Sequence, residues 1–340
     1  MRREYAGLLA LLVIVSATVA ATRDDPPALY KLEKTVPVPG TGGWDYLTVD
    51  SEGRRVYVSH ATCVEVLDAD SGELKGKVAD TSGIHGIAIA SELGRGFTSN
   101  GKANNVTVFD LKTLKPLATV STGKNPDAIL YDPASRRVFA FNGAEASATA
   151  IDAATGKVAG TIDLGGKPES GVSDGAGNVY VNMEDKDEVL KLDANKLKVL
   201  ARWPIAPAKT PVSLAIDTRN GRLFVGCRSK SLVVLSTETG KTVTSLPIGG
   251  GVDAGAFDPE TKLVFCSCGD GTVAVIRQET ADKYALVETL KTRSGSRTMA
   301  LDLKTHKLFL PAADFKAPAD QPKARPTMVP GTFSVLIYGK

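Results

Sequence analysis

The order of small, apolar and acidic residues repeats along the chain. One seven-residue pattern of small and apolar residues closes on Asp in six of its seven copies, as in Pro126-Asp-Ala-Ile-Leu-Tyr-Asp132 and Pro211-Val-Ser-Leu-Ala-Ile-Asp217. The closing position falls at residues 50, 90, 132, 174, 217, 258 and 302, which gives a period of 40 to 44 residues. Self-similarity at a fixed period of this length indicates a repeat architecture in which each copy is one structural unit.

Each copy continues with three further short strands separated by turn residues. The second strand of the unit reads Val179-Tyr-Val-Asn182 in one copy, the third reads Val106-Thr-Val-Phe-Asp110 in another, and the fourth reads Val158-Ala-Gly-Thr-Ile162 in a third. Four such strands in about 42 residues are typical of a propeller blade, whereas a helical repeat would need 3.6-residue apolar periodicity. We therefore predict an all-β fold, a seven-bladed β-propeller of four-stranded antiparallel blades. The predicted blades begin near residues 43, 83, 125, 167, 210, 251 and 295.

The last unit contains only three of its four strands. Its third strand, Phe333–Tyr338, ends two residues before the end of the sequence, while a strand-like segment at residues 29–38 precedes the first unit. We predict that this N-terminal strand completes the last blade and closes the ring, because closure protects sheet edges that would otherwise be exposed. The alternation of Leu32, Val36 and Val38 with polar residues predicts a half-buried outer strand.

The first residues of the chain have the features of a secretory signal. Arg2 and Arg3 precede an apolar stretch from Ala6 to Val15, and small residues follow up to Ala21. The apolar run is shorter than the roughly 20 residues of a membrane-spanning helix, and the small residues suit a signal peptidase. We predict a signal peptide at residues 1–21, a single propeller domain at 22–340, and a periplasmic or secreted protein without a membrane span once the signal is removed.

Composition adds two constraints. The net charge of +3, from 41 Lys and Arg against 38 Asp and Glu, argues against a dedicated nucleic-acid binder. An oxidising compartment permits disulfides, but four cysteines allow three complete pairings, and buried free thiols fit the sequence equally well. The four cysteines are Cys63, Cys227, Cys266 and Cys268. We expect the protein to be a monomer.

The second and third strands resemble those of a known family. Val56-Tyr-Val-Ser59 and Val179-Tyr-Val-Asn182, each followed by a third strand such as Val64-Glu-Val-Leu-Asp68, look like the YVTN-repeat (YncE-like) propellers of exported bacterial proteins. The resemblance covers residues 29–340 and implies a seven-bladed propeller. It implies no single activity, because propellers host many functions. Seven-bladed propellers related to this family include lactonases with acidic and His residues at the channel.

Two sets of residues are expected to converge on one mouth of the central channel. The first strand of a blade starts at the face where the second strand ends, so the second residue of the seven-residue pattern and the last residue of the second strand should each form a ring. The first ring contains Asp45, His85, Asp127, Glu169, Val212, Asp253 and Arg297. The second ring contains His60, Asn100, Asn142, Met183, Cys227, Cys268 and Ala312.

The polar members of these rings predict a ligand site, although the entrance of a channel is wet and also tolerates polar residues that bind nothing. Carboxylates with imidazole suit a divalent cation or acid–base chemistry. The metal-ligand candidates are Asp45, His85, Asp127 and Glu169. The ligand-binding candidates are Asp45, His60, His85, Asn100, Asp127, Asn142, Glu169, Asp253 and Arg297.

We expect an exported binding protein that holds a small polar ligand, a peptide or a protein partner at this loop face. The sequence has no Gly-x-Ser-x-Gly elbow, no His-Glu-x-x-His and no phosphate-binding loop. The alternative is a lactonase-like or metal-assisted hydrolase, in which His85 or His60 acts as general base and Asp45 orients it or holds a metal. A divalent cation is the cofactor that this alternative implies.

Overall fold

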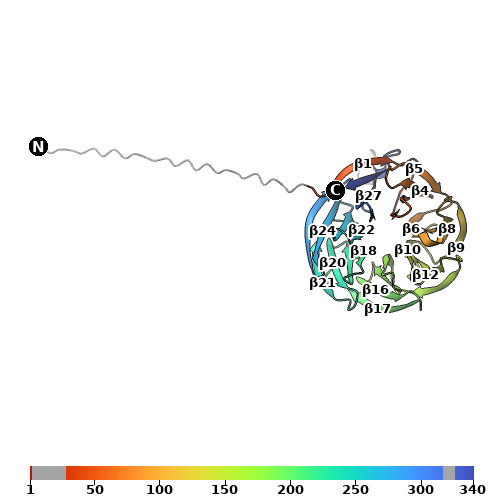
Figure 1. Cartoon of the computed structure of the whole chain (residues 1–340). Coiled ribbons are helices and arrows are strands. Elements are labelled where there is room, and N and C mark those ends of the chain that lie inside the picture. The colour runs from red at the N-terminus through yellow and green to blue at the C-terminus, as the bar shows by residue number, and fades with distance from the viewer. Residues whose placement is uncertain (2–27, 317–325) are drawn as a thin grey trace.

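The computed structural model of the chain describes Met1 and residues 28–316 and 326–340. Seven four-stranded antiparallel sheets are arranged in a ring, which confirms the predicted all-β, seven-bladed propeller (Figure 1). The predicted signal peptide, residues 1–21, lies outside the described residues apart from Met1. The described part of the chain contains no helix long and apolar enough to cross a membrane.

In each of the first six blades the strands pair in chain order, and the first strand lines the channel. Blades 1 to 3 are β2 (Leu47–Asp50), β3 (Arg55–His60), β4 (Cys63–Asp68) and β5 (Leu74–Val78); β6 (Ile84–Ala90), β7 (Arg95–Asn100), β8 (Asn105–Asp110) and β9 (Pro116–Ser121); and β10 (Pro126–Asp132), β11 (Arg137–Asn142), β12 (Ser147–Asp152) and β13 (Val158–Asp163). Blades 4 to 6 are β14 (Pro168–Ser173), β15 (Asn178–Met183), β16 (Glu188–Asp193) and β17 (Lys198–Pro204); β18 (Pro211–Asp217), β19 (Arg222–Cys227), β20 (Ser231–Ser236) and β21 (Thr242–Pro247); and β22 (Val252–Asp258), β23 (Leu263–Cys268), β24 (Thr272–Thr280) and β25 (Lys283–Lys291). One short 3-10 helix, η1 (Ser91–Leu93), follows β6.

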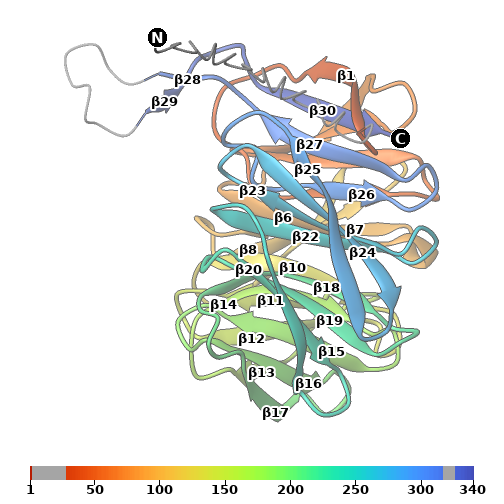
Figure 2. The ribbon, with the colours of Figure 1, turned by 90° about the vertical axis from the view of Figure 1, so that its left-hand side faces the viewer.

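Blade 7 is built from both ends of the chain. Its strand order is β26 (Ala300–Asp302), β27 (Lys307–Ala312), β30 (Ser334–Gly339) and β1 (Lys31–Pro37), so the N-terminal strand closes the ring as predicted. Figure 1 shows β1 beside the C-terminal blade. A small two-stranded sheet, β28 (Phe315–Lys316) with β29 (Thr327–Met328), projects from one face of the ring (Figure 2).

The outer strand β1 departs from the sequence pattern at one residue. Val36 and Val38 are buried, as expected, but the side chain of Leu32 is 52% exposed. The register of β1 against β30 shifts between Leu32 and Lys34, and such an irregularity changes which side chains face inward. The prediction that Leu32 is half-buried is therefore wrong.

The apolar core lies between neighbouring blades. Phe97 and Val108 of blade 2, for example, pack against Val138 and Ala140 of blade 3, and all four are almost completely buried. Burial of such side chains stabilises by roughly 1.5–3 kcal/mol each for the larger ones. Each blade is thus held mainly by its two neighbours, which makes closure of the ring essential to its stability.

The recurrent Asp at the end of the inner strand caps the following turn. The Gly53 amide donates to Asp50 Oδ1 at 2.9 Å, and the Ser135 amide donates to Asp132 Oδ2 at 2.8 Å. A short carboxylate suits this position because it reaches backbone amides two or three residues ahead. The repeat of Asp in the sequence is thereby explained by turn geometry.

All four cysteines, Cys63, Cys227, Cys266 and Cys268, carry free thiols in the structure. Cys63 is partly exposed and the other three are buried. Burial raises the pKa of each thiol, so they are protonated near neutral pH.

Candidate functional site

The inner strands are shaped so that their second residue faces the channel mouth. In five blades the pairing of the first two strands shifts register at this point, for instance between Pro126 and Ile129. Bulges of this kind re-aim side chains and are common beside functional sites. In blades 1 and 7 the paired part of the inner strand begins only at Leu47 and Ala300, later than the sequence pattern places it.

The fourth residue of the second-strand tetrapeptide, such as Ser59 in Val56-Tyr-Val-Ser59, forms a hydrogen bond to the backbone at the start of an inner strand. Ser59 Oγ accepts from the Asp45 amide at 2.7 Å, Ser267 Oγ donates to the Arg297 carbonyl at 2.5 Å, and Asn182 Nδ2 donates to the Ser213 carbonyl at 3.0 Å. The Ser267 and Asn182 bonds cross to the next blade, so in these two cases one blade fixes the start of its neighbour's inner strand.

Nine side chains form a chain of alternating charge around the mouth. It consists of five carboxylates and four cationic groups, and each cationic group lies between two carboxylates. The contacts run from Asp127 to His85 (Oδ1–Nδ1, 3.6 Å), His85 to Asp45 (Nδ1–Oδ2, 2.7 Å), Asp45 to Arg297 (Oδ1–Nη2, 3.4 Å), Arg297 to Asp253 (Nε–Oδ2, 2.5 Å), Asp253 to Arg228 (Oδ1–Nη2, 3.5 Å), Arg228 to Glu184 (Nη1–Oε1, 3.1 Å), Glu184 to Lys167, and Lys167 to Glu169 (Nζ–Oε2, 3.4 Å).

The chain of charges has a gap where its two ends meet. Asp127 of β10 and Glu169 of β14 stand on neighbouring inner strands, and no cationic side chain bridges them among the described residues. Glu169 is 7% exposed, and its buried Oε2 accepts no hydrogen bond within the described part of the chain. Each of the two carboxylates has a cationic partner only on its far side, so the surplus of five carboxylates over four cationic groups falls at the gap.

Burial and mutual repulsion raise the pKa of both carboxyl groups at the gap. Burial is the largest cause for Asp127, and the charges of Asp45 and Asp253 add to it, which raises its pKa to about 6 despite His85. For Glu169, burial again comes first, followed by repulsion from Asp127 and Glu184, and its pKa is raised strongly. Buried carboxyl groups behave in this way when too little positive charge is near them.

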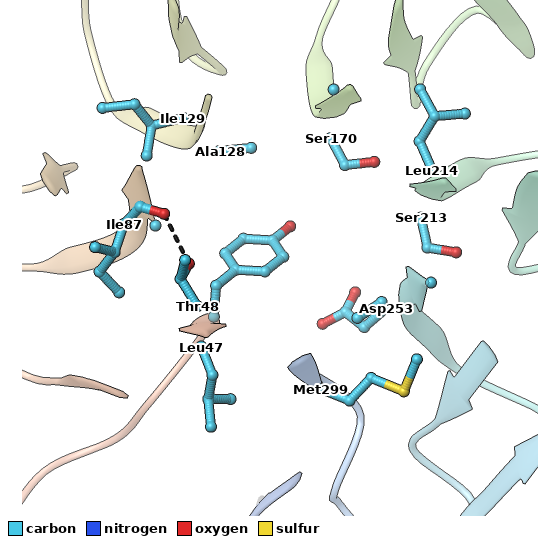
Figure 3. Close-up of a pocket in the computed structure, with 15 residues that line it drawn as sticks. Leu47, Thr48, Ile87, Ala128, Ile129, Ser170, Ser213, Leu214, Asp253 and Met299 are labelled. Carbon is cyan, nitrogen blue, oxygen red and sulfur yellow. Dashed lines mark hydrogen bonds between the residues drawn. The ribbon is translucent and has the colours of Figure 1, made fainter. Parts of the chain in front are cut away.

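A cavity of about 160 Å³ lies in the channel next to this mouth; it is lined by Asp253 of the ring and by residues that follow the other ring positions, such as Ala128 after Asp127 and Ser170 after Glu169. Figure 3 shows apolar side chains, among them Ile129, Leu214 and Met299, around the cavity together with the hydroxyl of Ser213 and the carboxylate of Asp253. Ser213 Oγ is buried and has no hydrogen-bond partner in the described structure. Tyr46 also lines the cavity, and burial together with the surrounding carboxylates raises its pKa well above the usual value, so its phenol stays neutral.

His85 is held as a cationic link in the chain of charges. Its Nδ1 faces both Asp45 and Asp127, while a Cβ placed on Gly101 would lie 2.6 Å from Nε2, which shows how closely that edge of the ring is packed. Burial alone would lower the pKa of His85, but the hydrogen bond with Asp45 and the charge of Asp127 outweigh burial and raise it. The imidazole is thus held through Nδ1 by the two carboxylates.

The structure does not bring the second predicted ring to the mouth. Asn100 and Asn142 are fully buried and donate to side chains of their own blades, such as Thr107 and Thr149. His60 is 3% exposed and stacks on Phe333 with ring centroids 4.7 Å apart. Burial lowers the pKa of His60, although Glu65 and the Gly42 carbonyl oppose this. The remaining members of the second ring, Met183, Cys227, Cys268 and Ala312, are buried as well.

From the first ring, six members do meet at the mouth, and the seventh, Val212, is buried in the core. Sequence reasoning missed Tyr46, Lys167, Glu184 and Arg228. Glu184 and Arg228 each directly follow a second strand, and Lys167 and Tyr46 flank the predicted ring position. These four residues could therefore have been found by also considering the residues within two positions of each predicted ring residue.

No protein-family model matches the sequence, and no curated protein matches it. The fold is similar to several solved structures. A chain of the mitotic checkpoint complex aligns with a TM-score of 0.75 at 14% identity, covering 96% of this chain and 99% of that one. Hydrazine synthase from Kuenenia stuttgartiensis gives 0.71 at 14% identity over 86% and 97%, and the RRP9 WD40 repeats give 0.74 at 9% identity over 89% and 96%. At these identities the likeness shows the propeller fold alone.

Proposed function

We propose that this protein binds a small cationic ligand at the channel mouth, with the positive charge of the ligand between Asp127 and Glu169. The observation that carries the proposal is the gap in the chain of alternating charge. A cation placed there would continue the alternation and would compensate two carboxylates whose ionisation is now opposed by burial.

The cavity limits the size and nature of the ligand. Its volume of about 160 Å³ is close to that of a cavity of about 150 Å³ that holds one benzene-sized molecule. Its lining combines apolar residues with polar ones such as Asp253 and Tyr46. A divalent ion with its waters or a small organic ammonium compound fits this volume, whereas a protein chain could only cover the mouth from outside.

Calorimetric titration of the purified protein tests the proposal, with Mg²⁺ or Ca²⁺, which prefer oxygen ligands, and small primary amines as separate series. We expect one ligand class to bind with saturable heat, and Asp127→Asn and Glu169→Gln each to abolish that heat. Glu238→Gln, which removes an exposed carboxylate on a turn between β20 and β21, is the matched control and should bind normally. Absence of saturable binding in both series, or unchanged binding by both mouth variants, would contradict the proposal.

A protein partner could also supply the positive charge. One of the similar solved structures is a chain of the mitotic checkpoint complex, so a propeller of this shape can be part of a protein assembly. A peptide or protein partner that presents a Lys side chain would place the same positive charge at the gap. The amine series above represents this chemistry.

We further propose that the protein is exported and belongs with the YVTN-repeat (YncE-like) propellers. Arg2, Arg3 and the apolar run from Ala6 to Val15 support export, and the Val-Tyr-Val second strands support the family. No specific observation on the described residues favours the hydrolase alternative: His85 Nδ1 is paired with Asp45 and Asp127, and His60 is buried away from the mouth.

A further inference from the structure

A second cluster of metal-ligating side chains lies in blade 1, apart from the residues of the channel mouth. His60 ends β3, and Cys63 and Glu65 stand near the start of β4. His60 pairs directly with Cys63 across the two strands, and Cys63 and Glu65 are two residues apart, so all three side chains are on one face of the blade. One ligand atom from each residue lies within 4.8 Å of the others.

The spacing of these atoms is close to that of a tetrahedral metal site. Cys63 Sγ is 3.5 Å from Glu65 Oε1, and His60 Nδ1 is 4.0 Å from the same oxygen. Bond lengths of about 2.3 Å to sulfur and about 2.1 Å to nitrogen and oxygen place tetrahedral ligand atoms about 3.4–3.6 Å apart. Small side-chain shifts would bring the three ligand atoms to this spacing, and a water molecule would take the fourth position.

The carboxylate of Glu65 lacks the cationic partner that a buried carboxylate usually has. Its Oε1 accepts a hydrogen bond from the Cys63 thiol. Glu65 is 6% exposed, yet no Lys or Arg nitrogen within the described ranges lies within 4.0 Å of its carboxylate, and Lys77 opposite it on β5 forms no ion pair. A buried carboxylate without a cation is costly, and a bound metal ion would supply the missing charge.

We propose that His60, Cys63 and Glu65 bind a divalent metal ion of the zinc class. Imidazole and thiolate ligands favour such an ion over magnesium or calcium, which prefer oxygen ligands alone. On binding, the Sγ–H bond of Cys63 is replaced by an Sγ–metal bond, and the proton leaves to solvent. The partly exposed side chain of Cys63 gives the ion access to the site.

The site lies where the first and last blades meet. Gly40, in the segment between β1 and β2, passes so close to the imidazole that a Cβ there would be 2.8 Å from His60 Cε1, and Phe333 of blade 7 stacks on the same ring. Metal binding would fix His60 against both segments. We therefore expect zinc to raise the melting temperature of the whole protein.

Cobalt substitution tests the site on the full protein after chelator treatment. We expect one equivalent of Co²⁺ to produce a sulfur-to-cobalt charge-transfer band that Zn²⁺ displaces and that Cys63→Ser removes. Glu65→Gln should weaken cobalt binding about tenfold or more, since even outer partners of metal ligands carry 10–100-fold effects. Asp127→Asn is the control that alters only the channel mouth and should leave the band unchanged, so the two proposals can fail separately.

Thiol reactivity gives a second readout that does not depend on cobalt. Cys63 is the only cysteine that is not buried, so a disulfide reagent should modify one thiol in the native protein. Zn²⁺ should protect that thiol, and Glu65→Gln, which keeps the thiol, should lose the protection. A wild-type protein without the charge-transfer band, or with equal thiol reactivity in the presence and absence of Zn²⁺, would overturn the proposal.

Discussion

Asp127 is a carboxyl group that is buried beside other carboxyl groups, and its ionisation costs stability. Its pKa of about 6 lies above the ordinary 3.8, so between these values the unfolded chain loses the proton while the folded protein retains it. Stability therefore falls as pH rises through this window, and the penalty is complete above about pH 6. At about 1.4 kcal/mol per unit of pKa, the penalty reaches at most about 3 kcal/mol.

Asp127→Asn removes this ionisation and is expected to stabilise the ligand-free protein by up to about 3 kcal/mol at about pH 8, with little difference at about pH 4. Urea unfolding of both proteins at several pH values measures the effect. Glu238→Gln, an exposed carboxylate, should show no such pH-dependent gain. If Asp127→Asn is less stable than the wild type at the higher pH, the ionised Asp127 carboxylate is stabilised by its cationic neighbours and carries no penalty.

The mouth residues differ in how far the sequence reveals them. Asp45, Asp127 and Asp253 occupy one position of the repeat, so counting along the period is enough to predict that they meet. Glu184 and Arg228 follow the second strands by one residue, and the sequence analysis placed the ring on their neighbours Met183 and Cys227. Because side chains alternate across a strand, that single residue separates the channel mouth from the interior of the blade.

At the scale of elements, the closing strand β1 holds the first and last blades together. It pairs with β30 along its length, and Tyr30, Val36 and Val38 are buried around it. Deleting residues 22–38 from the protein without its first 21 residues should lower the melting temperature markedly and promote aggregation, since burying each large apolar side chain is worth about 1.5–3 kcal/mol and β30 would become an open edge.

Deletion of residues 22–28 alone removes no described strand and should have neither effect. Thermal unfolding and light scattering of the two truncated proteins provide the comparison. Equal stability of both would refute the role of β1 in closure.

The existence of β1 could be predicted by counting strands, because a three-stranded last blade needs a fourth. The register shift within β1 could not be predicted in this way. Leu32 belongs to an alternating pattern in the sequence, but the register shift before Lys34 turns it outward. Likewise, β2 and β26 begin later than the sequence pattern places them, and the Asp45 amide ahead of β2 donates to Ser59 Oγ. Periodicity predicts which elements exist but not the residue at which each begins.

For the whole molecule, the ring closes at blade 7, where β1, whose chain continues into blade 1, pairs non-covalently with β30. Besides β1, polar contacts cross it on both faces: Arg297 reaches Asp45 at the mouth, and Arg54 Nη1 donates to Asp302 Oδ2 at 2.8 Å on the opposite face. The side chain of Asp302 is fully buried and that of Arg54 is 20% exposed. Removing one partner of such a pair leaves the other charge buried, which makes this contact a sensitive probe of closure.

Arg54→Gln is therefore expected to destabilise the protein by about 1–3 kcal/mol, the cost of leaving a buried acceptor without its partner. Lys283→Gln, which breaks an exposed ion pair with Glu279 within blade 6, should cause little change. Burial alone would raise the pKa of Asp302, but hydrogen bonds from its neighbours, Arg54 among them, hold it below the usual value. The stabilisation by this pair is thus present at neutral pH and is lost only as pH falls through that lowered pKa. Urea unfolding at about pH 7 and in acid measures the free energy of unfolding of Arg54→Gln and of the wild type. The difference between them should shrink only below about pH 4. If Arg54→Gln loses no more stability than Lys283→Gln at neutral pH, the core between the blades closes the ring without this contact.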